Sequence, residues 1–328
     1  MQNRVRTRLT IAAAAMLLAT GCAPQPAESS ERSAEAEAAV ETIRISGPAG
    51  PPSLPLLRMI ETAALGDTEL VFERWETADQ LVTGVTEGID FAAAPLTTGA
   101  VLAAQGAEIR LANVSAWDVS GLVTTDTQIA EIEDLAGKTI HVAMQASAVD
   151  YTMQLILEEH GLGDEVTIDY VDPLNGPEQL LAGQIDTLVT VEPQLTLMLA
   201  NSPDARSVVD FQAEWETITQ SNAPLPTAGT FVNRQFAERH PDLVEQFVAA
   251  YAEAASWIEQ HPAEAAELAA SQLGLPSPIL EAAIPKMSWA PQPAAKVQDD
   301  VMLYYETLYA NWPDSIGGQL MAEDFFVK

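Results

Sequence analysis

The chain has 328 residues, enough for two domains with a sizeable core, and its apolar content is ordinary for a globular protein. Asp and Glu number 47 against 15 Lys and Arg, and this imbalance argues strongly against a nucleic-acid partner, because phosphate binding needs clustered basic residues. Cys22 is the single cysteine, so the sequence offers no disulfide, no CxxC metal site and no catalytic thiol in the folded body.

The first 22 residues have the pattern of an export signal. Arg4, Arg6 and Arg8 precede an apolar stretch at 9–19 that is too short to span a bilayer. A small residue before Cys22 resembles the lipobox of bacterial lipoproteins, in which the cysteine becomes the acylated N-terminus and anchors the protein to a membrane. The alternative is an ordinary secretory signal with a chance cysteine. Residues 23–41, rich in Ala, Glu, Ser and Pro, predict a disordered tether.

The next segment predicts a first lobe of strands and helices. Ser53 follows a Gly- and Pro-rich turn and precedes a helical pattern, so it either caps that helix or helps to hold a ligand with the amides nearby. Thr77 is predicted to cap a second helix, and Pro95 to open a third. The predicted strands are residues 43–46, 69–75, 89–94, 110–116 and 119–124, and the predicted helices are 54–65, 77–86 and 95–105.

A second lobe follows with the same alternation. Ser147 is predicted to cap a helix that runs through His160, and Glu192-Pro193 opens a later helix. The predicted strands are residues 139–143, 166–171, 186–191 and 206–211, with a short helix at 177–181. Strands that alternate with helices indicate an α/β fold built on parallel sheets.

Residues 83–95 and 181–193 weakly echo one another, which suggests two lobes built alike. Ligands of open α/β sheets sit beyond the carboxyl ends of the strands, so two such lobes predict a cleft between them. Crossings near 120–124 and 229–232 would form a hinge. The C-terminal helices begin with Pro241 and Pro262 in their first turns, and their apolar residues at helical spacing are expected to pack on the sheet.

These residues resemble the solute-binding lipoproteins of ABC importers, in the group that binds nitrate, sulfonates, taurine and thiamine precursors. The resemblance runs over residues 43–326 and is carried by the segments 134–140, 183–186, 192–193, 236–268 and 311–326. It implies the type II periplasmic-binding-protein fold, with lobe 1 at 42–119 and 230–328 and lobe 2 at 120–229. It also implies an extracytoplasmic, monomeric protein with no cofactor that passes a small molecule to a permease and ATPase.

The expected ligand contacts lie at strand ends and helix starts. They are Ser53, Leu54, Pro95, Leu96, Thr97, Thr98, Trp117, Ser147 and Glu192. Helix N-termini favour an anionic group, and a tryptophan stacks on an apolar or aromatic part. Trp117 fits a core position equally well, and Glu192 also fits as the cap of its own helix. The turn at 144–148 departs from the Gly-Ser-Thr-like turn of the family, with Ser147 alone matching in kind, which leaves the exact pocket open.

The ligand's charge stays open, because no arginine lies in a motif that clearly faces the cleft. An anion held by an arginine clamp is therefore not favoured, and a neutral or zwitterionic aromatic fits equally well. Catalysis is not expected, since the sequence contains no GxSxG, P-loop, GxGxxG or HExxH motif. No two of the four histidines are spaced i, i+4, which argues against a His-based metal site. The alternatives are an enzyme of the thiamine-pyrimidine synthase type, whose cysteine-rich motif is absent, and a ligand-sensing domain.

Overall fold

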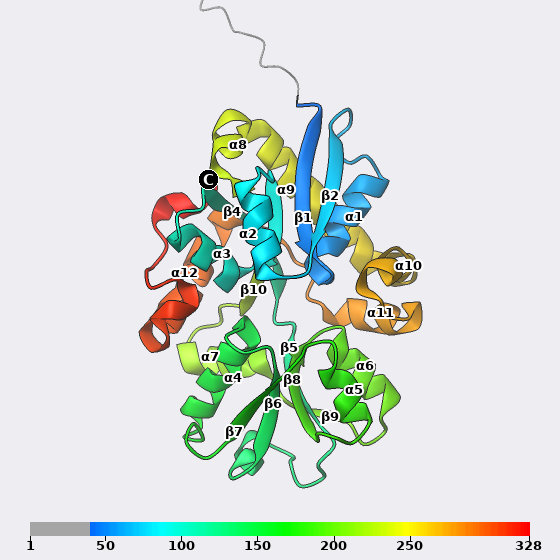
Figure 1. The fold of residues 1–328 in the computed structure, drawn as a ribbon, viewed down its shortest axis with the longest axis vertical. Coiled ribbons are helices and arrows are strands. Elements are labelled where there is room, and N and C mark those ends of the chain that lie inside the picture. The colour runs from blue at the N-terminus through cyan, green and yellow to red at the C-terminus, as the bar shows by residue number, and fades with distance from the viewer. Residues whose placement is uncertain (1–39) are drawn as a thin grey trace, which may run out of the picture. The chain divides into compact units, whose positions relative to one another are not determined.

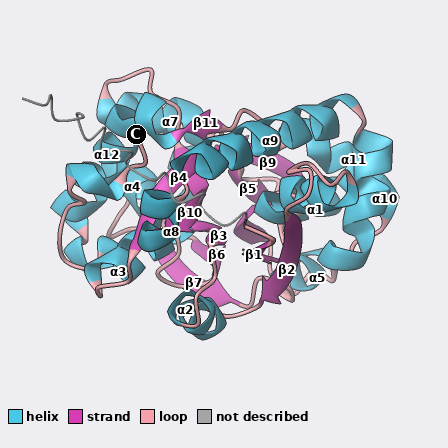
Figure 2. Cartoon of the chain, turned by 90° about the horizontal axis from the view of Figure 1, so that it is seen from above, coloured by secondary structure: helices cyan, strands magenta, loops and turns pink. Residues whose placement is uncertain are grey.

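The computed structural model describes residues 40–328, apart from the side chains at 271 and 272, and these residues form one compact body. Two mixed β-sheets flanked by helices carry it (Figures 1 and 2), which confirms the predicted α/β class. The predicted signal with Cys22 and most of the predicted tether lie outside the described residues. No helix among residues 40–328 is long and apolar enough to cross a membrane.

Lobe 1, as we use the term, is built around a six-stranded sheet with the order β11-β4-β10-β3-β1-β2. Its strands are β1 (Thr42–Pro48), β2 (Glu69–Trp75), β3 (Phe91–Pro95), β4 (Ile109–Trp117), β10 (Pro226–Asn233) and β11 (Gln292–Pro293). Lobe 2 is built around a five-stranded sheet with the order β7-β6-β8-β5-β9. Its strands are β5 (Ser120–Thr124), β6 (Thr139–Ala143), β7 (Thr167–Val171), β8 (Thr187–Val191) and β9 (Arg206–Val209).

The expected parallel pairing is confirmed for β6 with β7 and β8 and for β1 with β2 and β3, but each sheet also contains antiparallel strands. The chain enters lobe 2 through β5 and returns to lobe 1 through β10. Both strands run antiparallel to their neighbours. Ser120 starts β5 opposite Val191 at the end of β8, and Pro226 starts β10 opposite Trp117 at the end of β4. Each entering strand thus begins at the edge where its partner ends, and it can only run back along that partner.

Three predicted boundaries need correction. Residues 226–229, expected in lobe 2, belong to β10 and pair within the lobe 1 sheet, so the second crossing lies at 219–226. The strand predicted through Phe211 ends at Val209, because the Asp210 side chain accepts the Ala213 N–H and caps a helix there. Val40 and Glu41, the last residues of the expected tether, join the fold, since their carbonyls accept from Thr68 and Glu69.

Helices cover the faces of both sheets (Figure 1). Those of lobe 1 are α1 (Leu54–Glu61), α2 (Ala78–Thr86), α3 (Leu96–Ala104), α8 (Arg234–Arg239), α9 (Pro241–Gln260), α10 (Pro262–Leu273), α11 (Ser277–Ala283) and α12 (Gln298–Asn311). Those of lobe 2 are α4 (Ala148–Glu159), α5 (Gly176–Leu181), α6 (Gln194–Asn201) and α7 (Phe211–Thr219). Among the short 3-10 helices are η1 (Pro51–Ser53), η3 (Ile284–Lys286) and η5 (Pro313–Ile316).

One apolar cluster contains residues of both lobes. Trp215 of α7 lies edge-on to Tyr304 of α12, with ring centroids 5.9 Å apart, and both side chains are buried. Beside them, Tyr151 of α4 lies 5.4 Å from the Trp312 ring that follows α12. Tyr304 of α12 therefore contacts α7 of lobe 2, and Trp312, just after α12, contacts α4.

Candidate ligand-binding site

The predicted contacts of lobe 1 lie along one edge of its sheet. Pro95 ends β3 and pairs with Ala228, while Trp117 ends β4 and pairs with Pro226 at the start of β10. Ser53 reaches the same edge, because its hydroxyl donates to the carbonyl of Pro48 at the end of β1 over 2.6 Å. The structure therefore brings together the lobe 1 residues that the sequence singles out.

The side chains of two predicted contacts, Ser53 and Leu54, are buried in the protein. Ser53 does not cap α1, since its hydroxyl is engaged with the Pro48 carbonyl. It sits where Gly47 leaves room, because a Cβ at Gly47 would lie 2.2 Å from the Ser53 oxygen. Leu54 is 1% exposed and belongs to an apolar cluster with residues of α9, α10 and α11. Of the two, Leu54 can offer a ligand little more than its backbone.

The first turn of α3 brings two threonine hydroxyls to this edge. Leu96 is buried, and its carbonyl accepts the Tyr305 hydroxyl over 2.9 Å. Thr97 is 5% exposed and Thr98 half-buried, and neither hydroxyl bonds to a partner within the described residues. Pro95, in the N-cap position, supplies no side-chain acceptor. Backbone N–H groups and two hydroxyls are thus available at a helix N-terminus, where negative charge is favoured.

Trp117 occupies a core position. Its side chain is 5% exposed, and its indole N–H donates to the Ala290 carbonyl over 2.9 Å. Asp118, at the crossing into lobe 2, has a φ of 36°. Burial, with a smaller contribution from the charge of Asp210, raises the pKa of Asp118 to about 6. The Oδ1 atom of Asp118 is buried without a hydrogen-bond partner among the described residues.

On the lobe 2 edge, Ser147 serves as a helix cap. Its hydroxyl oxygen accepts the Asp150 N–H over 3.3 Å, as the sequence predicts for the start of this helix. The buried Asp150 carboxylate accepts from the Ala146 N–H, the Gln154 amide and, at 3.3 Å, the Tyr170 hydroxyl. A negative charge already lies at the N-terminus of α4, which makes this end less favourable for an anionic ligand group than the start of α3.

Glu192 caps its own helix. The side chain is 5% exposed, and its two oxygens accept the N–H and the hydroxyl of Thr196, each over 3.0 Å. Burial raises the pKa of Glu192, opposed by these two hydrogen bonds and by the positive charge of Lys286. Lys286, from η3 of lobe 1, donates to the Thr196 hydroxyl over 3.0 Å. The interpretation of Glu192 as a helix cap is confirmed. Its partner Thr196 also accepts a hydrogen bond from Lys286 of lobe 1.

Sequence reasoning missed two apolar side chains at this edge. Met144 follows β6 with a φ of 69° and is 54% exposed, and Leu174 follows β7 and is 75% exposed. The Met144 N–H donates to the Val171 carbonyl, so the two turns lie side by side. A leucine within the polar turn at 172–176 was the available signal, since apolar residues in such turns need a partner to cover them.

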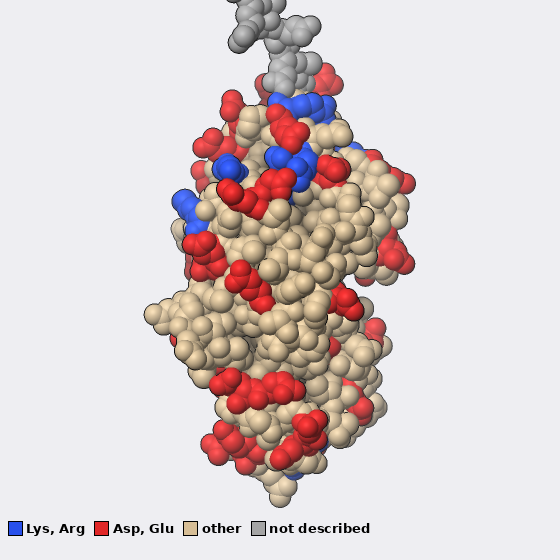
Figure 3. All heavy atoms as spheres, turned by 90° about the vertical axis from the view of Figure 1, so that its left-hand side faces the viewer, with Lys and Arg blue, Asp and Glu red and all other residues tan. Residues whose placement is uncertain are grey.

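The arginines of the described body are occupied elsewhere. Each one among residues 40–328 donates to a carboxylate or a backbone carbonyl: Arg44, Arg58, Arg74, Arg110, Arg206, Arg234 and Arg239. On the face shown in Figure 3, acidic side chains are spread over both lobes, and the larger basic groups lie among acids of lobe 1. This arrangement offers no arginine clamp for a simple anion.

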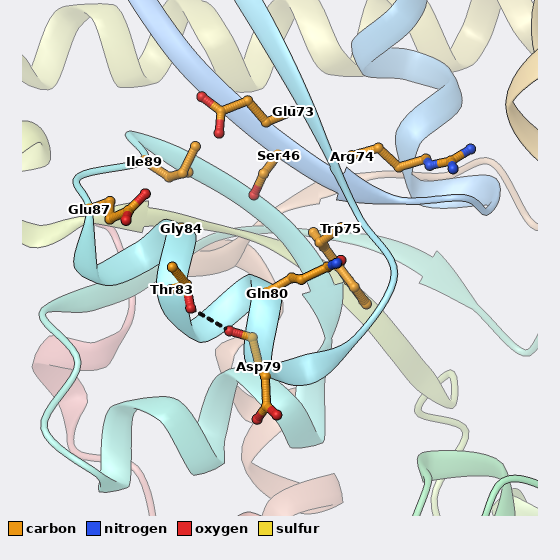
Figure 4. Close-up of a pocket in the computed structure, with 10 residues that line it drawn as sticks. All are labelled: Ser46, Glu73, Arg74, Trp75, Asp79, Gln80, Thr83, Gly84, Glu87 and Ile89. Carbon is orange, nitrogen blue, oxygen red and sulfur yellow. Dashed lines mark hydrogen bonds between the residues drawn. The ribbon is translucent and has the colours of Figure 1, made fainter.

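Two hollows of the described residues are lined by other side chains, and none of the predicted contacts lines either one. The first, about 330 Å³, lies between α2 and the strands β1 and β2 (Figure 4). The Ser46 hydroxyl oxygen there is buried without a partner among the described residues. Nearby polar groups bond to one another: Arg44 bridges to Glu73, and the Thr83 hydroxyl donates to the Asp79 carbonyl. The second hollow, about 260 Å³, lies beside Lys138 in lobe 2. Within residues 40–328, no group of three His, Cys, Asp or Glu could hold a metal ion.

Two helix-flanked mixed sheets, joined by two crossings of the chain, define the fold class of the periplasmic binding proteins. The chain belongs to the NMT1-like family, whose model matches residues 77–273, more than half of the sequence. A putative aliphatic sulfonates-binding protein of Bacillus subtilis (strain 168) is 27% identical over 160 residues. That match covers 49% of this chain and 46% of the relative, so the chain spans about half the length of the curated protein it matches.

Solved structures share the fold over most of the chain. An ABC transporter protein from Parabacteroides distasonis has a TM-score of 0.75 at 16% identity, covering 88% of this chain and 99% of its own. The periplasmic aliphatic sulphonate binding protein of Escherichia coli has a TM-score of 0.68 at 18% identity, covering 87% and 93%. The alkanesulfonate-binding protein of Xanthomonas axonopodis pv. citri, solved with MOPS bound, has a TM-score of 0.66 at 20% identity, covering 83% and 94%. The expected family group and fold are confirmed.

Proposed function

We propose that this protein is an extracytoplasmic solute-binding protein, which captures a small organic molecule between its lobes and delivers it to an ABC importer. The observation that carries the proposal is the position of the two sheet edges. The crossing at 117–120 joins the edge where β4 ends directly to the edge where β8 ends. Ligands of open α/β sheets bind beyond such strand ends, and family membership supports the same role.

The chemistry of the two edges favours an organic anion. The first turn of α3, with the Thr97 and Thr98 hydroxyls, suits a sulfonate-like group held by N–H and O–H donors. Met144 and Leu174 at the lobe 2 edge suit an apolar body, which inorganic nitrate lacks. The names of the sulfonate-binding relatives agree with this ligand class. A neutral aromatic such as a thiamine-precursor pyrimidine is the second candidate, supported by the absence of an arginine clamp among the described residues.

We assign the remaining predicted contacts smaller roles in ligand binding. Pro95 and Ser147 border the ligand, and the Ser53 turn contributes backbone. Leu54, Leu96 and Trp117 shape the edge through the core they belong to, because their side chains are buried. Glu192 acts through Thr196 and does not need to touch the ligand.

The ligand assignment predicts a local effect of one hydroxyl. In the full chain, Thr97→Val should weaken binding of pentanesulfonate and MOPS about ten- to hundredfold, because a hydrogen bond to a charged group contributes about 1.5–3 kcal/mol. Titration calorimetry with these sulfonates, nitrate and a hydroxymethylpyrimidine would measure it. Thr83→Val is the matched control, since its hydroxyl bonds within α2 and lines the hollow between α2 and the strands β1 and β2. Weaker binding in Thr83→Val with no change in Thr97→Val would place the ligand in the hollow and contradict the proposal.

Membrane attachment is proposed through Cys22, which would hold a soluble, monomeric binding module near its permease and ATPase. Cys22→Ala should release the protein from the membrane fraction while leaving ligand affinity unchanged. Retention of this variant in the membrane would contradict lipidation at Cys22.

An enzyme on the same fold would instead turn over a thiamine-precursor substrate. Product formation under the conditions of the binding experiment, without dissociable binding, would overturn the solute-binding role.

A further inference from the structure

The two lobes touch at two places of different character. At one, the buried rings of Trp215 in α7 and Tyr304 in α12 meet, and Trp312 after α12 lies against Tyr151 of α4. At the other, α11 and η3 of lobe 1 lie against α6 of lobe 2 (Figure 1). The second contact includes a polar link that runs from an exposed lysine into a buried site. This difference indicates which contact opens first when the lobes separate.

The polar link consists of Lys286, Thr196 and Glu192, which we call the interlobe latch. The Lys286 ammonium donates to the Thr196 hydroxyl, and that hydroxyl donates to the Glu192 carboxylate, each over 3.0 Å. Thr196 is 2% exposed and Glu192 is 5% exposed. Lys286 is ninety residues away in the chain and belongs to the other lobe. The hydroxyl therefore relays a lobe 1 donor to a buried lobe 2 acid.

Charge couples this link to the separation of the lobes. A buried carboxylate is costly unless it is hydrogen-bonded and near a positive charge. Lys286 provides such a charge for Glu192, although burial still raises the carboxyl pKa. When α11 and η3 move away from α6, Glu192 keeps the Thr196 N–H but loses the nearby ammonium. Opening at this contact thus carries a free-energy cost that the closed arrangement avoids.

The other contact is made by larger apolar groups. Trp215 is 0% exposed and Tyr304 is 1% exposed, so parting α7 from α12 would expose large apolar surfaces. The latch has a single direct hydrogen bond between the lobes, made by a lysine with an exposed stem. The lobes are therefore expected to pivot about α12 and to part at the latch.

We propose that Lys286 is a positioning residue that holds the lobes closed through Thr196 and Glu192 and so sets the fraction of binding-competent protein. The second half of this inference rests on the proposed function, because it assumes a ligand between the lobes. An apparent dissociation constant rises in proportion as the competent fraction falls. Lys286 therefore tunes ligand affinity without touching the ligand.

The test measures lobe separation in the absence of ligand. The full chain carries Cys22→Ala, which removes its only thiol, and dyes are attached at Glu253→Cys in α9 and Asp164→Cys in lobe 2, both exposed positions. Single-molecule energy transfer then gives the ratio of open to closed molecules. Lys286→Met should raise this ratio about three- to tenfold, the effect of one lost hydrogen bond. Lys296→Met, the same charge change at an exposed position of lobe 1, should leave the ratio unchanged.

A second pair of variants separates the relay from a general loss of stability. Thr196→Val removes the hydroxyl at constant volume and should open the protein as Lys286→Met does, whereas Thr196→Ser should restore the closed ratio. Equal ratios in Lys286→Met and Lys296→Met would overturn the inference. Failure of every ligand probe to bind would contradict the proposed function alone, because the ratio is measured without ligand. Where a probe binds, Lys286→Met should raise its dissociation constant by the factor by which the closed fraction falls.

Discussion

Asp118, at the crossing between the lobes, combines an unusual backbone conformation with a buried carboxylate. Its backbone has a positive φ, which Asp and Asn adopt more readily than most residues. Its carboxylate is largely buried, one oxygen has no partner among the described residues, and the charge of Asp210 adds repulsion. The pKa of Asp118 rises to about 6 for these reasons. The folded protein thus keeps a proton on Asp118 that the unfolded chain releases at lower pH.

The pH dependence follows from this difference. Between the ordinary pKa of 3.8 and the folded value of about 6, the folded state binds more protons, so the free energy of unfolding falls as pH rises. The penalty is complete above about pH 6 and absent below about pH 4. Asp118→Asn, which keeps the backbone preference, should stabilise the protein by about 1–2 kcal/mol at neutral pH, after allowance for partial exposure.

Urea unfolding of Asp118→Asn and the parent chain at several pH values would check this prediction. The gain should shrink steadily as the pH is lowered. Asp299→Asn, on the exposed first turn of α12, serves as the control for a simple change of net charge. A gain that is constant with pH, or equal in the control, would show that burial of Asp118 is not its cause.

At the scale of the elements, helix starts follow from nearby residues. Thr77 and Ser147 cap α2 and α4, each accepting an N–H three residues ahead, as the sequence predicts. How tightly a helix then packs depends on its distant neighbours. A Cβ at Gly84 in α2 would meet one side-chain atom, Cγ1 of Ile89, at 3.2 Å, so Ile89 would need to shift by a few tenths of an ångström. In α3, by contrast, a Cβ at Gly99 would lie 2.0 Å from the ring of Phe231 on β10.

These two helical glycines predict effects of different size for the same substitution. Gly99→Ala should destabilise the protein by about 1–3 kcal/mol, because the added methyl must displace a buried ring in a packed core. Gly84→Ala should change stability by less than about 1 kcal/mol, since the helix preference of alanine offsets the small shift required of Ile89. Thermal and chemical unfolding of both variants would compare them directly. A stable Gly99→Ala would mean that α3 approaches β10 less closely than the structure shows.

At the scale of the whole body, the lobes share a core. The cluster that includes Trp215 and Tyr304 contains strands and helices of both lobes. Complete unfolding of either lobe would therefore expose apolar surface of the other lobe. We expect residues 40–328 to unfold in one cooperative transition, in spite of two separate sheets.

Trp215→Ala should both lower the melting temperature and uncouple the lobes. The cavity costs about 3–5 kcal/mol and removes the main ring that lobe 2 contributes to α12. Scanning calorimetry should then show a broadened or split transition. Phe247→Ala is the matched control, because Phe247 stacks on Phe91 inside a lobe 1 cluster, so its loss should lower the melting temperature without splitting. Splitting in the control alone would contradict the shared core.

The sequence alone determined the order of the elements, several of their caps and the family. Periodicity, turn residues and caps such as Ser147 act over a few positions, so they can be predicted from residues that are adjacent in the sequence. The same local signals placed the expected contacts at strand ends and helix starts. They also misplaced the start of β10 and overlooked α7, where strand and helix patterns meet at short apolar runs.

Tertiary structure alone decided what each of those residues does. Trp117 gives its indole N–H to Ala290, far along the chain, and so serves the core. Lys286 meets Thr196 across ninety residues, and Met144 remains exposed beside the turn after β7. Burial and hydrogen bonding depend on groups that the chain brings together only on folding. For this reason the sequence identified the family and the edges of the candidate site, whereas the fold selected the polar and apolar groups available there.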